Sequence, residues 1–135
     1  MAGVSATAPL PWQAAKPLDL SVELGPGLEP ARLQAGLERL CREPGIRALV
    51  AFGSRGRGEA RADSDLDLAV ICAEASLTPE QKRVCWRRCR DALGLLGQNV
   101  DLVVVGAADA AHLAGSRWHV MGDVAREGKV LYAAG

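Results

Sequence analysis

Two short apolar segments that lie close together in the sequence limit the fold more than any other feature. Residues 46–52 (IRALVAF) and residues 65–72 (DLDLAVIC) are rich in strand-forming residues and are bounded by glycine or polar residues. Most of the residues between them, 53–64, are glycine or charged. A connection between parallel strands usually takes a dozen residues or more, most of them helical. The spacing therefore favours an antiparallel pair.

The remaining segments alternate between helical and strand patterns. Thr78 followed by Pro79 and Gln81 has the residues of a helix cap and capping box, and Pro44-Gly45 ends an earlier helical pattern. A chain of 135 residues, 49% of them apolar, suits a single core. These segments predict an α+β fold, a small mixed β-sheet backed by helices: a helix over 31–43, strands over 46–52 and 65–72, a helix from 79, a strand over 99–105, a helix over 107–127 interrupted by Gly115 and Gly122, and a short strand over 129–133.

The first thirty residues differ from the rest of the chain, because they hold five of the seven prolines. We interpret residues 1–30 as a proline-rich N-terminal arm and residues 31–135 as the folded domain. Within the arm, residues 18–24 (LDLSVEL) alternate apolar and polar residues and could form an edge strand. A partly disordered tail fits this segment equally well.

Charge and composition exclude several classes of protein. The formal net charge is zero, whereas a general nucleic-acid-binding surface would be basic overall. No segment has the ~20 apolar residues of a membrane helix, and the N-terminus has no signal-peptide pattern. We therefore expect a cytoplasmic protein whose four cysteines are small buried hydrophobes in a reducing compartment. Trp86 is expected in the core, and the sequence does not decide whether the chain self-associates.

Three acidic residues are candidates for a metal site. Asp65 and Asp67 alternate with leucines on a strand, so both carboxylates should point to the same face. Asp101 lies between apolar neighbours on the strand predicted over 99–105 and could join them if the two strands are adjacent. Carboxylate oxygens on one face suit magnesium, and three carboxylates can hold two ions. Taken alone, an Asp-x-Asp pair is more often a solvated strand edge.

Gly53-Ser54 is the candidate phosphate-binding segment. Gly53 permits a tight turn and close approach of a ligand, and Ser54 could cap a short helix over residues 55–60. Arg55, Arg57 and Arg61 are near enough in sequence to donate charge-assisted hydrogen bonds to a triphosphate. A turn with surface arginines is the alternative interpretation of the same residues.

The joint spacing resembles the polymerase-beta-like nucleotidyltransferase superfamily. Its signature is Gly-Ser, about ten residues, Asp-x-Asp and a further Asp on a later strand, here Gly53-Ser54, Asp65-Leu66-Asp67 and Asp101. The text GSRGRGEARADSDLDLAV over 53–70 and REGKVLY over 126–132 are similar to the MntA-like minimal nucleotidyltransferases. Gly56 departs from that pattern, in which alanine is common. The resemblance covers about residues 31–133.

The resemblance implies a polymerase-beta-like fold and transfer of a nucleoside monophosphate from a nucleoside triphosphate, AMP from ATP in the first instance. Asp65 and Asp67 would bind two Mg²⁺ ions, and Asp101 would bind the catalytic ion and help to deprotonate an acceptor hydroxyl. Gly53 and Ser54 would hold the terminal phosphates, with Arg57 or Arg61 assisting.

The resemblance further implies an antitoxin of a type VII-like toxin–antitoxin system that modifies a partner HEPN-domain toxin. Two alternatives stay open: a nucleotidyltransferase that modifies a small molecule such as an aminoglycoside, and a non-catalytic antitoxin that acts by binding.

Overall fold

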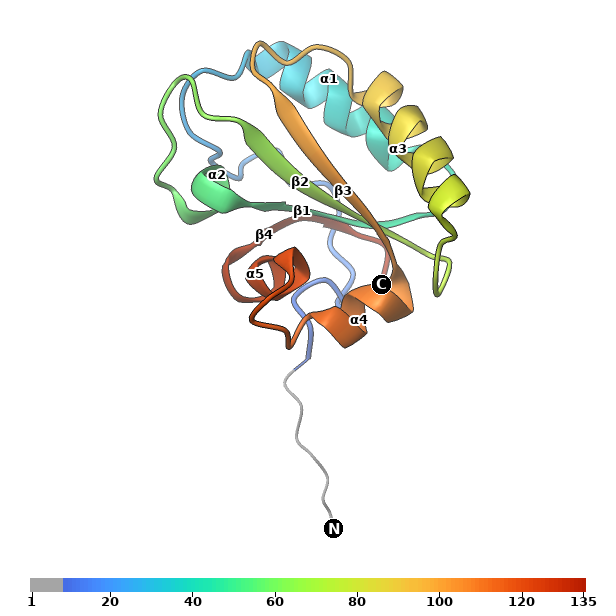
Figure 1. Ribbon diagram of the computed structural model, residues 1–135. Coiled ribbons are helices and arrows are strands. Elements are labelled where there is room, and N and C mark those ends of the chain that lie inside the picture. The colour runs from blue at the N-terminus through green and yellow to red at the C-terminus, as the bar shows by residue number, and fades with distance from the viewer. Residues whose placement is uncertain (1–8) are drawn as a thin grey trace.

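The computed structural model describes residues 9–135, in which helices and strands follow one another as the sequence pattern indicates (Figure 1). The predicted strand pair is formed by β1 (Ile46–Phe52) and β2 (Leu66–Cys72), and the capping box of Thr78 and Gln81 is present at the start of α3. The full order is α1 (Pro30–Cys41), β1, α2 (Gly53–Arg57), β2, α3 (Pro79–Leu93), β3 (Val100–Gly106), α4 (Ala107–Leu113), α5 (Val120–Glu127) and β4 (Lys129–Ala133).

The four strands form one mixed sheet in the order β3-β2-β1-β4. β1 pairs antiparallel with β2 and with β4, which confirms the antiparallel pair expected from the short connection. β2 and β3 pair parallel, and α3 forms the long connection that a parallel pair requires. The fold is therefore the predicted α+β arrangement of a mixed sheet backed by helices.

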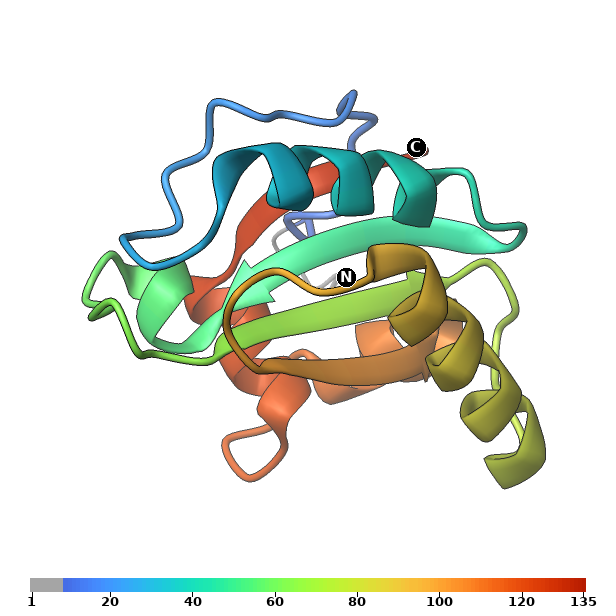
Figure 2. The ribbon, with the colours of Figure 1, turned by 90° about the horizontal axis from the view of Figure 1, so that it is seen from above.

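Helices cover both faces of the sheet and bury a separate apolar cluster on each. Figure 1 shows α1 and α3 on one face and α4 and α5 on the other, and Figure 2 looks down on the face under α1 and α3. Leu66, Leu68 and Val70 of β2 point into the first cluster, whereas Ala69 and Ile71 point into the second. This alternation places Asp67 on the side of α4 and α5.

The described part of the arm, residues 9–29, crosses the open edge of β4 without forming a strand. Lys16 makes an isolated bridge with Ala133, and Trp12 is buried in the cluster beside α5. The edge strand predicted over 18–24 is wrong, because the Asp19 side chain accepts a hydrogen bond from the Ser21 N–H and turns the chain. Residues 1–8 lie outside the described residues.

Two further expectations are corrected. Residues 107–127 form two helices rather than one, since residues 114–119 turn and the His119 side chain caps α5 by accepting from the Met121 N–H. Trp86 of α3 is not a core residue, because 42% of it is exposed. None of the helices in residues 9–135 is long and apolar enough to span a membrane.

Candidate active site

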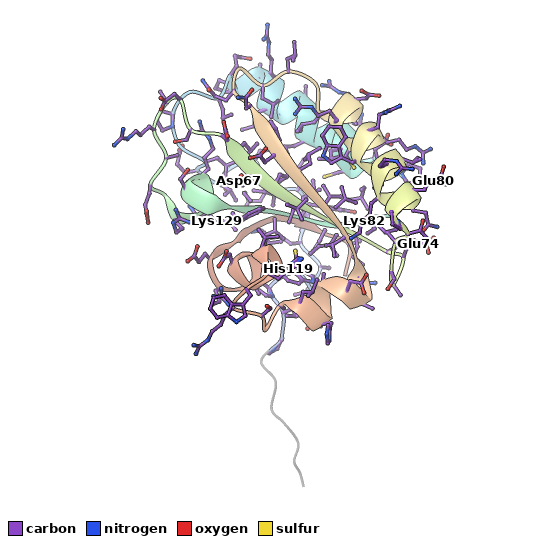
Figure 3. All side chains as sticks on the ribbon, in the orientation of Figure 1. Asp67, Glu74, Glu80, Lys82, His119 and Lys129 are labelled. Carbon is purple, nitrogen blue, oxygen red and sulfur yellow. The ribbon has the colours of Figure 1, made fainter. Side chains whose placement is uncertain are left out.

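The register of β2 and β3 brings the predicted acids together at one end of the sheet. Asp67 and Asp101 are direct partners in the parallel pair, and Asp65 lies two residues before Asp67 on the same face. Asp67 is half-buried, whereas Asp65 and Asp101 are exposed. Figure 3 labels Asp67 close to α2, near the start of β2. The three carboxylates thus lie on the face predicted from the sequence.

Asp67 is the carboxyl whose ionisation this arrangement perturbs. Partial burial raises its pKa above the usual range, and repulsion from Asp101 and Asp65 raises it further. A hydrogen bond with Asp101 acts in the same direction, while the Arg57 guanidinium lowers the pKa. The fold therefore holds Asp67 in an environment that disfavours its negative charge, as expected of a site prepared for a cation.

Gly53 is the residue that makes room for the Asp67 carboxylate. Its neighbour Phe52 is the antiparallel partner of Asp67, so the chain turns into α2 directly beside that side chain. Gly53 has a φ of 66°, and a Cβ atom there would lie 2.1 Å from Asp67 Oδ2. Because the Asp67 carboxylate itself fills that space, glycine is the residue that lets the chain turn into α2 this close to the acid.

Ser54 lies inside α2 rather than at its cap. The helix begins at Gly53 after Phe52, which makes no side-chain capping hydrogen bond. The expectation that Ser54 caps a helix over residues 55–60 is therefore wrong in register. Ser54 remains one residue from Gly53 and half-buried at the same end of the sheet.

Arg57 lies at the site and Arg61 is exposed. The guanidinium of Arg57 forms ion pairs with Glu127 at 3.2 Å and with Glu59 at 3.3 Å, and it acts on the pKa of Asp67. Glu127 raises the pKa of Arg57 by accepting its hydrogen bond, so this guanidinium stays charged. Arg61 is tied down through its backbone, whose N–H donates to Ser64 Oγ at 2.8 Å.

Arg55 has a different role from the phosphate donor expected of it. It is fully buried, and its guanidinium donates to the carbonyls of Leu24 and Pro26 in the arm and of Arg61 and Ser64 in the loop before Asp65. Nothing in the local sequence distinguishes Arg55 from the two other arginines. It contributes support to the site rather than contact with a ligand.

The donor set suits magnesium. Within residues 9–135, no group of three or more acidic, histidine or cysteine side chains is gathered closely enough to hold a metal ion. Repulsion between like charges opposes such gathering. The carboxylates of Asp65, Asp67 and Asp101 are hard oxygen ligands at one end of the sheet, and the Asp67 carboxylate lies against Gly53. Their chemistry therefore fits the ion, while their side chains are not gathered around one point.

Comparisons with known proteins point to one family. The family model described as polymerase beta, nucleotidyltransferase, matches residues 37–134. Among solved structures, the chain is similar to a protein inferred to be a minimal nucleotidyltransferase, with 35% identity, 73% of this chain and 88% of that chain covered, and a TM-score of 0.47.

Two further solved structures are similar. One is a toxin–antitoxin structure with AMP-PNP, with 25% identity over 73% of this chain and 71% of that chain and a TM-score of 0.48. The other is an inferred nucleotidyltransferase from Sulfolobus solfataricus, with 17% identity over 76% and 77% and a TM-score of 0.50, which supports the fold. None of the curated proteins matches the sequence.

Proposed function

The chain belongs to the polymerase beta nucleotidyltransferase family, and on that premise we propose that it transfers AMP from ATP to a hydroxyl group of a partner protein. One observation carries the proposal. Asp67 and Asp101 are partners across β2 and β3, Asp65 precedes β2 at the same end of the sheet, and Gly53 lies against the Asp67 carboxylate. Such a group of carboxylates has no role in packing, because burial disfavours its charge.

The proposed roles follow from position. Asp65 and Asp67 would hold two magnesium ions, and Asp101 would share one of them. Bound magnesium would supply charge neutralisation of the triphosphate and activation of the attacking oxygen. Asp101 is exposed and next to Asp67, so its carboxylate can accept the proton of an incoming hydroxyl. Gly53 and Ser54 would contact the terminal phosphates, and pyrophosphate would leave.

Arg57 and Arg61 have different roles in the proposal. Arg57 is held near Asp67 by Glu59 and Glu127 and could donate to a phosphate oxygen by exchanging one of these partners. Arg61 is exposed in the loop before Asp65 and would reach the triphosphate only from its outer side.

A hydroxyl on a macromolecule suits this site better than a small acceptor. Asp65 and Asp101 are exposed at the end of the sheet, whereas sites for small molecules usually enclose most of the ligand. The resemblance of residues 53–70 to minimal nucleotidyltransferases adds a HEPN-type toxin as the candidate partner, which makes the chain an antitoxin that acts by AMPylation.

The test incubates the purified protein with ATP, magnesium and a HEPN-type protein encoded by the neighbouring reading frame. Intact-mass spectrometry of the partner should show a gain in steps of one AMP. Asp101→Asn should abolish the gain. Asp63→Asn is the matched control, because Asp63 is an exposed carboxylate in the loop before Asp65. This substitution should leave the mass gain unchanged.

Three results separate the alternatives. An unchanged partner mass with all four triphosphates contradicts AMP transfer to that protein. Protection against the toxin that survives replacement of Asp65 and Asp67 by Asn shows that binding alone suffices. Labelled ATP that reaches an aminoglycoside but never a protein identifies a small-molecule enzyme.

A further inference from the structure

Three cysteine thiols meet at the opposite end of β2 from the acids. Cys72 is the last residue of β2, and Cys85 and Cys89 lie on the face of α3 that packs over it. Cys85 Sγ is 3.6 Å from Cys72 Sγ and 3.9 Å from Cys89 Sγ. Cys85 is therefore the central thiol, with one neighbour from the sheet and one from its own helix.

A cavity opens onto this cluster from solvent. It has a volume of about 570 Å³, is lined by all three cysteines, and carries the charged side chains of Glu43, Glu74, Glu80 and Arg88. In Figure 3, Glu74 and Glu80 lie at the far end of the sheet from Asp67. The cavity is thus separate from the candidate active site, and the proposed function does not use it.

The surroundings favour the thiolate form of Cys85 over that of its neighbours. Hydrogen bonds from Cys72 and Cys89 lower the pKa of Cys85, and the charge of Arg88 lowers it further. The hydrogen bonds with Cys85 raise the pKa of Cys72 and of Cys89, and burial raises both further. The negative charge of Glu74 adds to the effect at Cys72, and that of Glu43 at Cys89. Cys85 is also half-buried, whereas Cys72 and Cys89 are buried.

We propose that Cys85 is a modification site that reacts with hydroperoxides and then forms a disulfide with Cys72. The Cys85 thiolate attacks one peroxide oxygen, the O–O bond breaks, and the other oxygen leaves as water after taking up a proton. Cys72 then attacks the sulfur of the resulting sulfenic acid, and a second water leaves as the S–S bond forms. Two thiols lose two electrons and two protons, and one hydrogen peroxide is reduced to two waters.

Cys72 is the partner because the geometry favours it over Cys89. Its sulfur is the nearer of the two and must approach by only about 1.5 Å to reach the length of a disulfide bond. Cys85 and Cys89 lie one turn apart on α3, where closing the bond would require both side chains to adjust on a regular helix. The Cys72–Cys85 bond would tie α3 to the end of β2.

The test treats the intact protein with one equivalent of hydrogen peroxide and maps it after trypsin digestion. The sequence separates the thiols, since Cys72, Cys85 and Cys89 fall in peptides 62–82, 84–87 and 89–90, and Cys41 in 40–42. We expect a mass loss of about 2 Da and a cross-linked pair of peptides 62–82 and 84–87. A link that involves Cys41, a link between 84–87 and 89–90, or no link within one chain would overturn the assignment.

Alkylation by iodoacetamide at different pH values gives a second readout without any variant. Burial raises the pKa of the Cys41 thiol to about 11, so its alkylation rate should rise about tenfold per pH unit between pH 6 and 8.5. The rate for Cys85 should be nearly flat over the same range. Parallel rises for the two thiols would contradict a thiolate at Cys85.

Two variants assign the steps. Cys72→Ser should remove the cross-link and leave Cys85 as a sulfenic acid that a 1,3-diketone reagent traps. Cys41→Ser is the matched control and should cross-link like the parent protein. A Cys72→Ser protein in which Cys85 is not oxidised would refute Cys85 as the first thiol to react, provided that circular dichroism shows the fold to be retained.

Discussion

Replacing Arg55 by methionine tests whether a buried guanidinium holds the site together. Arg55 is 0% exposed and donates five hydrogen bonds, at 2.8–3.4 Å, to the carbonyls of four residues. Each hydrogen bond from a charged donor contributes about 1.5–3 kcal/mol, and breaking a buried charged network usually costs about 3–5 kcal/mol in total. Water can reach several of these carbonyls after the change, so we expect a loss of about 3–5 kcal/mol in the free energy of unfolding.

Urea and thermal unfolding followed by circular dichroism measure this loss. For a chain of this size the expected change is a fall in Tm of about 10–20 °C. Arg57→Met is the matched control, because Arg57 lies two residues away with exposed ion pairs, and its Tm should not change measurably. Arg55→Lys should fall between the two, since an ammonium has three donors and cannot span four carbonyls.

A local effect beside the acids should accompany the loss of stability. Arg55 donates hydrogen bonds to the carbonyl of Ser64, the residue before Asp65. Arg55→Met should therefore speed amide hydrogen exchange in residues 61–66 more than in β1. An Arg55→Met protein as stable as Arg57→Met, or one whose exchange rises uniformly, would refute a supporting role for this guanidinium.

Three other substitutions have directions set by the structure. Gly53→Ala should abolish transfer, because the alanine Cβ would collide with Asp67 Oδ2 and the backbone φ of 66° disfavours a side chain. The intact mass of the partner measures the loss of transfer, and binding of labelled ATP shows whether the nucleotide is still held. Gly56→Ala should destabilise the fold by about 1 kcal/mol in urea unfolding, since its Cβ would lie 2.8 Å from the Ala51 carbonyl oxygen while alanine favours the helix. Asp67→Asn should raise Tm at pH 7 while abolishing transfer, because the raised pKa makes the charged carboxylate unfavourable in the fold. That gain in Tm should vanish as the pH falls below the ordinary aspartate pKa, where Asp67 is protonated in both folded and unfolded states; a constant difference would contradict it.

The acids were predictable because strand geometry alone decides where they point. The period of two places Asp65 and Asp67 on one face. Asp101 joins them because the register pairs it with Asp67, and a shift by one residue would turn it to the other face. The short connection over residues 53–64 likewise favoured the antiparallel pair that the sheet contains. The common face of Asp65 and Asp67 and the antiparallel pair follow from local periodicity and chain length, whereas the register that adds Asp101 is a tertiary feature.

The contact among the cysteines is a feature that composition does not predict. Four cysteines without a C-x-x-C pattern suggested inert buried side chains, and Cys72 and Cys89 are indeed buried. The sulfurs of Cys72 and Cys85 meet because α3 packs over the last residue of β2. The crossing of a helix over a strand is a tertiary feature, and no residue spacing reports it.

The arginines between Gly53 and Asp65 bear on the boundary drawn between the arm and the folded domain. Arg55, Arg57 and Arg61 are equivalent in spacing, yet only Arg55 points inward, and two of its acceptors are the carbonyls of Leu24 and Pro26. Those carbonyls belong to the arm, and Leu24 is itself buried under α1 in the cluster that supports β2. A boundary at residue 30 therefore separates Arg55 from two of the four carbonyls that accept hydrogen bonds from its guanidinium. We infer that residues 24–26 support the loop before Asp65, and that the proline-rich composition which marked the arm as a separate segment reflects its irregular backbone rather than independence from the site.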